Sequence, residues 1–188
     1  MANDLNATVG ALLLGTLFTA VGFGITTMQT YMYMSRFPND PKIIRWTVWT
    51  LLVLDVTHVA LTWHMIYWYL ILNYNNPASL DLSVWSFDIT VVITAVVTVV
   101  AHCFYARRVY ILGNRQWIIA ALILILSAMR LIFGSYVTAR IFQIKLLKEL
   151  WGKIGVEVGV GMGAGTAADL LITISLVWYL RKHRGFSR

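Results

Sequence analysis

Five long apolar runs are the feature that most restricts how this chain can fold. They lie at about residues 7–34, 43–72, 85–111, 117–142 and 154–180. A hydrocarbon core about 30 Å thick needs roughly 20 apolar residues of helix, and each run reaches that length. Because the apolar residues do not alternate with a period of two, the runs do not fit barrel strands, and each is predicted to be a transmembrane helix.

The composition supports a membrane-embedded chain. Of the 188 residues, 59% are hydrophobic and only 12% are charged, and the mean hydropathy is +0.72. Such a chain has too little polar surface to cover a water-soluble globule of this size. No polar stretch is longer than a short loop, so we predict a single domain over residues 1–188, an all-α polytopic helix bundle whose main partner is membrane lipid.

The basic residues predict the orientation of the bundle. Ten Lys and Arg residues lie on one side of the predicted bundle: three after the first run, three at the end of the third run, and four in the basic tail 181–188. Four others lie between the fourth and fifth runs. The positive-inside rule then places the amino terminus outside and the carboxyl terminus in the cytosol, in the plasma membrane or an endomembrane. The dissenting basic segment, 141–154, suits an amphipathic helix in the outer interface. Because the basic residues form no aromatic-interleaved patch, we expect no nucleic acid partner.

Four ionisable residues fall near the centres of the predicted spans. Asp55 and His58 belong to the second run, Arg130 to the fourth and Asp169 to the fifth. Charges at this depth usually face the bundle interior or a water-filled cavity. In one interpretation Arg130 neutralises Asp55 or Asp169, and His58 carries protons or contacts a ligand. In the other interpretation all four only hold the helices together, and the sequence leaves both open.

Two further histidines are secondary candidates. His64 falls on roughly the opposite helical face from Asp55 and His58. His102 shares a stripe with Asp88, but fourteen residues of helix separate them by about 21 Å, so they cannot meet. Because these side chains differ in face and depth, we expect no metal site and no cofactor. No catalytic motif is present, so no catalytic residue is assigned and an enzyme is disfavoured.

A glycine ridge opens the fifth run. Gly155, Gly159 and Gly163 follow one another at four-residue spacing, and Gly161 and Gly165 lie on a neighbouring face. Such ridges let two helix backbones approach closely. The partner is either the first run, which also contains glycines, or another copy of the protein in a homo-oligomer. Packing within the chain is the favoured interpretation.

Several segments resemble a large family of multi-pass membrane proteins of unknown function from mushroom-forming fungi, the basidiomycetes. They are MQTYMYMSRFPND at 28–40, LDVTHVALTWHMIYWYLILNYNNPASL at 54–80, WS at 85–86, ARRVYILGNRQW at 106–117 and AADLLITISLVWYLRKHRGFSR at 167–188. The resemblance matches Asp55, His58, His64 and Asp169 to positions typical of the family. Family members typically have about seven helices, so the resemblance implies a short form that lacks the last two.

The resemblance implies no reaction, and three kinds of function remain as hypotheses. The first is a receptor-like or scaffolding helix bundle whose polar cluster stabilises two helix arrangements. The second is a proton-coupled transporter, because carboxylate and histidine side chains near the midplane are what proton relays use. The third is a membrane enzyme acting on a lipid-soluble substrate, with Asp55 or Asp169 as general acid.

Overall fold

The computed structural model describes residues 10–74, 76–115, 117–144 and 146–185. Its five long helices are α2 (Ala11–Arg36), α3 (Lys42–Tyr67), α4 (Trp85–Leu112), α5 (Trp117–Ile144) and α6 (Leu147–Gly185). A π-helical turn, η2 (Trp68–Leu72), extends α3, and a 3-10 helix, η3 (Pro77–Asp81), precedes α4. All five long helices are long and apolar enough to span a membrane, so the predicted all-α bundle is confirmed.

The helix boundaries agree with the predicted spans within a few residues, except at the fifth. Residues 7–9 of the first predicted span lie outside the described residues. Helix α6 begins at Leu147 rather than near residue 154, and α5 continues to Ile144. The amphipathic segment 141–154 is therefore not a separate interfacial helix, because its residues are divided between the end of α5 and the first turns of α6. The segment is rich in Leu, Lys and Glu, which favour helix, and it has no proline that would end α6 before residue 154.

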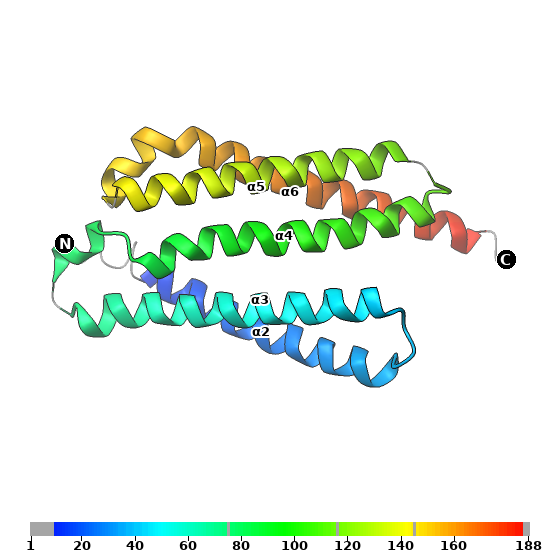
Figure 1. Ribbon diagram of the computed structural model, residues 1–188, viewed down its shortest axis with the longest axis horizontal. Helices are drawn as coiled ribbons and strands as arrows, with labels where there is room; N and C mark the ends of the chain where they lie inside the picture. Colours follow the sequence, from blue (N-terminus) through cyan, green and yellow to red (C-terminus); the bar gives the residue numbers. More distant parts are fainter. Residues whose placement is uncertain (1–9, 75, 116, 145, 186–188) are drawn as a thin grey trace.

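Proline and turn residues end the helices where the sequence predicts. Helix α2 stops before Pro38, because proline disfavours helical backbone at the residue before it, and Phe37 caps the helix by donating its N–H to Tyr33 O at 2.9 Å. Between α4 and α5, Asn114 and Arg115 adopt left-handed φ angles of 53° and 64°. These two residues lie in the turn that reverses the chain between the antiparallel helices α4 and α5 (Figure 1).

The five helices form two groups (Figure 1). Helices α4, α5 and α6 pack closely on one another, whereas α2 packs mainly on α3, which joins the other group through α4. The odd number of long helices leaves the two chain ends at opposite ends of the bundle. The two groups also differ in burial, because most of the buried side chains belong to α4, α5 and α6.

Two apolar clusters fill the α4–α5–α6 group at different depths. One contains Ala106, Val109, Ala120, Ile123, Ile172 and Tyr179. The other contains Val137, Ile141 and Ile154. Large apolar side chains cover the outside as well, and those of Phe18 and Val156 are 77% and 78% exposed. Such a surface is a liability in water but is expected of helices that face lipid.

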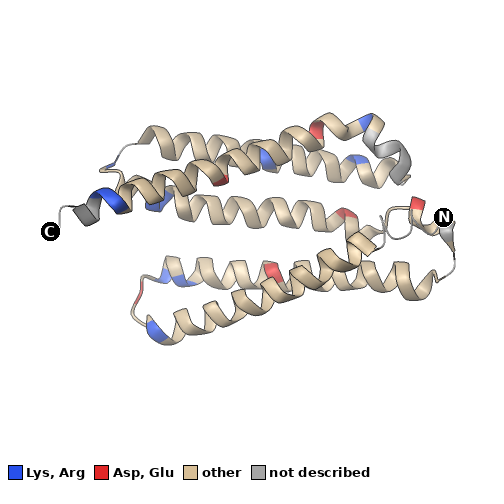
Figure 2. Cartoon of the chain, turned by 180° about the vertical axis from the view of Figure 1, so that it is seen from behind, with Lys and Arg blue, Asp and Glu red and all other residues tan. Residues whose placement is uncertain are grey.

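The charged residues lie mostly at the two ends of the helices. In Figure 2 most Lys and Arg positions gather at the helix ends and the intervening length is largely uncharged. This distribution is the one expected of a membrane-embedded bundle. The orientation of the bundle, with the amino terminus outside, stays a prediction.

Candidate functional site

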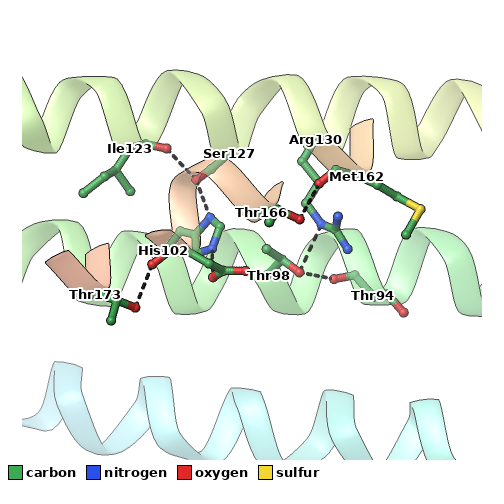
Figure 3. Close-up of polar contacts among 10 residues, drawn as sticks. Thr94, Thr98, His102, Ile123, Ser127, Arg130, Met162, Thr166 and Thr173 are labelled. Atoms are coloured by element: carbon green, nitrogen blue, oxygen red, sulfur yellow. Dashed lines mark hydrogen bonds and ion pairs between the residues drawn. The ribbon is translucent and has the colours of Figure 1, made fainter. Parts of the chain in front are cut away.

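A three-helix polar junction lies between the two apolar clusters. It consists of His102 from α4, Ser127 from α5 and Asp169 from α6, and Figure 3 shows His102 and Ser127 pointing toward each other. His102 Nδ1 lies 2.7 Å from Ser127 Oγ, and His102 Nε2 lies 2.9 Å from Asp169 Oδ1. His102 and Ser127 are 2% and 1% exposed, whereas the side chain of Asp169 is 69% exposed. One imidazole therefore links all three helices of the group.

The hydrogen bonds of the junction place one proton on Nδ1 of His102 and a second between Nε2 and the Asp169 carboxyl group. The Ser127 hydroxyl donates to Ile123 O at 2.7 Å, so its oxygen accepts a hydrogen bond from the Nδ1–H of His102. The other ring nitrogen, Nε2, faces a carboxyl oxygen, and two acceptors at 2.9 Å need a proton between them. That proton is carried either by an imidazolium beside a carboxylate or by a carboxylic acid beside a neutral imidazole. His102 and Asp169 thus form a proton-sharing pair.

Arg130 lies near the junction but is not part of the ion pair. Its Nε donates to Thr98 Oγ1 at 3.3 Å, and its side chain lies against Gly165 of α6. A Cβ atom at position 165 would lie 2.6 Å from Nη1 and 2.8 Å from Cδ of Arg130. Glycine at this position is therefore what lets the arginine side chain lie between α5 and α6.

The interpretation in which Arg130 neutralises Asp55 or Asp169 is wrong. Asp169 pairs with His102 instead, and Asp55 belongs to α3, which packs on α2 and α4. Among the described residues no carboxylate lies within ion-pair distance of the Arg130 guanidinium. The position of each residue along its helix is set by the sequence, whereas its partners depend on which helices pack side by side.

The remaining predicted residues fall into two separate places on α3. Asp55 and His58 are half-buried one turn apart, as their spacing predicts. His64 lies on the other side, where its Nδ1 is 2.9 Å from Ser86 Oγ and its ring centroid is 4.8 Å from that of Trp85. The predicted cluster of Asp55, His58, Arg130 and Asp169 is thus not one site.

The glycine ridge makes different contacts from those predicted. No atom of another segment lies within 4 Å of a Cβ built at Gly159 or Gly163, and Gly155 lines a cavity. The intrachain packing predicted for the ridge is therefore wrong at Gly159 and Gly163. The neighbouring glycines make the close contacts. Gly165 lies against Arg130, and a Cβ atom built at Gly161 would lie 3.1 Å from Cβ of Phe133.

A cavity of about 410 Å³ lies between α4, α5 and α6. Arg130 lines one part of it and Glu157 another. The lining between them is mostly apolar and includes Phe87, Val91, Phe133, Val137, Ile141 and Ile154. The volume falls within the range of about 300–1,000 Å³ that is typical of small-molecule sites. We call this space the Arg130 cavity.

A second pocket, a groove of about 540 Å³, lies between α4 and α6, and both pockets are partly open to the surroundings. His102, Asp169 and Thr98 line it. Thr98 accepts the hydrogen bond of Arg130, so this one side chain connects the groove to the Arg130 cavity. The exposed carboxyl group of Asp169 belongs to the groove and not to the cavity.

No family model, curated protein or solved structure matches the chain. The resemblance to the fungal family therefore stays a prediction.

Sequence reasoning missed the polar stripe of α4, although its signal is present in the sequence. Ser86, Thr90, Thr94, Thr98 and His102 follow one another at intervals of four residues, which places them on one face over about 24 Å of helix. Each threonine donates its hydroxyl proton to the carbonyl oxygen four residues earlier, at 2.7–2.8 Å. The stripe faces α3 through Ser86 and the α5–α6 side through Thr98 and His102.

Proposed function

We propose that the protein is a receptor-like integral membrane protein that crosses the bilayer five times and takes a small lipid-soluble ligand in the Arg130 cavity. The amino terminus is outside and the carboxyl terminus is cytosolic, as the basic loops favour. The observation that carries the proposal is the cavity itself. Its size and mostly apolar lining, with a few polar groups, are those of small-molecule sites.

A receptor needs two helix arrangements, and in this proposal they differ in the spacing of α5 and α6 at the junction. The cavity and the junction share the same three helices, and Thr98 bonds Arg130 of the cavity and lines the groove that also contains His102 and Asp169 of the junction. A ligand that separates α5 from α6 changes the distance between Ser127 and Asp169, which His102 now bridges. A ligand shifts such an equilibrium only by its difference in affinity for the two arrangements, so the ligand must bind one spacing of α5 and α6 more tightly.

A cavity-filling variant tests the proposal. Val91→Phe adds volume inside the cavity, and Val156→Phe adds the same volume on a surface that is 78% exposed. Purified protein in nanodiscs is incubated with a total lipid extract, and retained compounds are identified by native mass spectrometry. We expect a small molecule bound to the wild type and to Val156→Phe but lost in Val91→Phe. Equal retention by all three proteins would reject the cavity as the site.

A proton-coupled transporter is the second candidate, and one observation favours it. The proton shared by His102 and Asp169 lies beside an open groove, and intramembrane His and carboxylate pairs are used as proton relays. In proteoliposomes, a transporter should show a flux driven by a pH gradient that Asp169→Asn abolishes and Asp55→Asn leaves intact. Absence of any pH-driven flux in the wild type removes this candidate.

Self-association through the glycine ridge stays a prediction. Gly159 and Gly163 present an open face to the surroundings, which supports a homo-oligomer. Crosslinking in native membranes, compared between the wild type and Gly159→Leu, measures it.

A further inference from the structure

Arg130 lies at the depth where a cation is least tolerated. It is thirteen residues from the start of α5 and fourteen from its end, so about 20 Å of helix extends on either side. Arginine in the middle of a membrane helix is normally paired with a carboxylate or with backbone carbonyl groups.

Among the residues that the structure describes, Arg130 has only a neutral partner. A guanidinium has five N–H donors, and the described contact uses one of them, the bond to the Thr98 hydroxyl. No described carboxylate is within ion-pair distance. The Arg130 side chain also lines the Arg130 cavity, which puts the donors that Thr98 does not use within reach of a molecule bound there.

The two carboxylates on α6, Asp169 and Glu157, do not pair with Arg130. Asp169 is bonded to His102 at 2.9 Å. Glu157 lines the same cavity but precedes Gly165, the residue beside Arg130, by eight positions on α6, or about 12 Å along the axis. The cavity thus has a cationic pole at the midplane, an acidic pole nearer the membrane surface and apolar walls between them.

We propose that the Arg130 cavity binds a lipid-soluble monocarboxylic acid, with its carboxylate on Arg130 and its apolar chain along Phe133, Val137 and Ile141. This inference rests on the proposed ligand-binding function and names its ligand class. Guanidinium and carboxylate groups pair through two parallel hydrogen bonds. A phosphomonoester fits less well, because its charge of about −1.5 to −2 exceeds that of one guanidinium and Glu157 adds another negative charge.

A binding experiment separates the ligand class from the existence of the site. The protein is placed in phosphatidylcholine nanodiscs with cis-parinaric acid, a fluorescent fatty acid, and the probe is displaced with palmitic acid, methyl palmitate or hexadecyl phosphate. We expect saturable binding, and we expect palmitic acid to compete about 10- to 100-fold better than its ester, the range for a hydrogen bond to a charged group. The acid-to-ester ratio needs no variant and stands even if substitutions at Arg130 prevent folding.

The variants assign the effect to one side chain. Arg130→Gln should weaken probe binding about 10-fold or more and reduce the acid-to-ester ratio toward one. Arg130→Lys should restore part of both, because a lysine keeps the charge but not the planar fork. Arg107→Gln, which removes an exposed arginine of α4, is the matched control and should bind as the wild type does.

Each other outcome overturns a definite part. If acid and ester compete equally while Val91→Phe abolishes binding, the cavity stands and recognition of the acid is rejected. If only hexadecyl phosphate competes, the carboxylate class is rejected in favour of a phosphate headgroup. If no probe binds saturably to the folded wild type, both the ligand class and the ligand-binding function are rejected.

Discussion

Nε2 of His102 lies 2.9 Å from Oδ1 of Asp169, and this contact joins α4 to α6 at the depth where α5 contributes Ser127. The imidazole is almost fully enclosed, whereas the carboxyl group is largely exposed. The two partners should therefore respond differently to substitution.

His102→Leu should be the more damaging change at the junction. It leaves Ser127 without the ring that donates to it and Asp169 without its partner, so we expect a loss of about 1–3 kcal/mol. Asp169→Asn should cost less, because that side chain is 69% exposed. Thermal unfolding in detergent measures both, with His58→Leu as control. In the double variant the losses should not add, and strict additivity would contradict the contact.

Two neighbouring glycines of α6 should respond oppositely to alanine. Gly163→Ala meets no atom within 4 Å, so it should raise the stability by up to about 1 kcal/mol through its helix propensity. Gly165→Ala places a Cβ within 2.6 Å of Arg130 Nη1 and should displace the guanidinium from Thr98. We therefore expect Gly165→Ala to weaken cis-parinaric acid binding and Gly163→Ala to leave it unchanged. The same affinity for both variants would contradict the assigned position of Arg130.

Ser86→Ala should destabilise the contact between α3 and α4. The Ser86 side chain is fully buried and bonds Nδ1 of His64 at 2.9 Å, so its loss should cost about 1 kcal/mol. Ser135→Ala on α5 is the matched control, because that serine is exposed. Thermal unfolding of both variants in the same detergent measures the difference, and equal melting temperatures would exclude a stabilising bond to His64.

The orientation is testable by cysteine labelling. In a Cys103→Ser background, Asn76→Cys tests the connection between α3 and α4, and Asp40→Cys tests the connection between α2 and α3. With the amino terminus outside, a membrane-impermeant maleimide should label the Asn76→Cys protein in intact cells and the Asp40→Cys protein only after permeabilisation. The reverse pattern would invert the proposed topology.

The helices could be predicted because their signals are local. The ends of the spans are set by the length of each apolar run, by Pro38 and by the turn at Asn114 and Arg115. Each of these signals can be recognised without knowing which helices pack together. Only the segment 141–154 was misassigned, because an amphipathic pattern does not show whether a helix stops at the interface or continues inward.

The site could be predicted only in part. The depths of His102, Arg130 and Asp169 follow from residue counting, but their pairing depends on how each helix is rotated and which helices are adjacent. Arg130 was therefore matched to carboxylates, although none of the described ones lies within ion-pair distance of it. The threonines of α4 were missed although their four-residue spacing is plain, because single hydroxyl groups in an apolar helix are usually satisfied by their own backbone.

That same backbone bonding determines the chemistry of the α4 wall. Thr90 and Thr94 line the Arg130 cavity, and each donates its one hydroxyl proton to a backbone carbonyl oxygen of α4. What remains toward the cavity is oxygen lone pairs, so this wall accepts hydrogen bonds and offers none. A guest whose chain carries an alcohol at that depth gains a bond there, whereas a guest with a ketone meets oxygen against oxygen and is selected against.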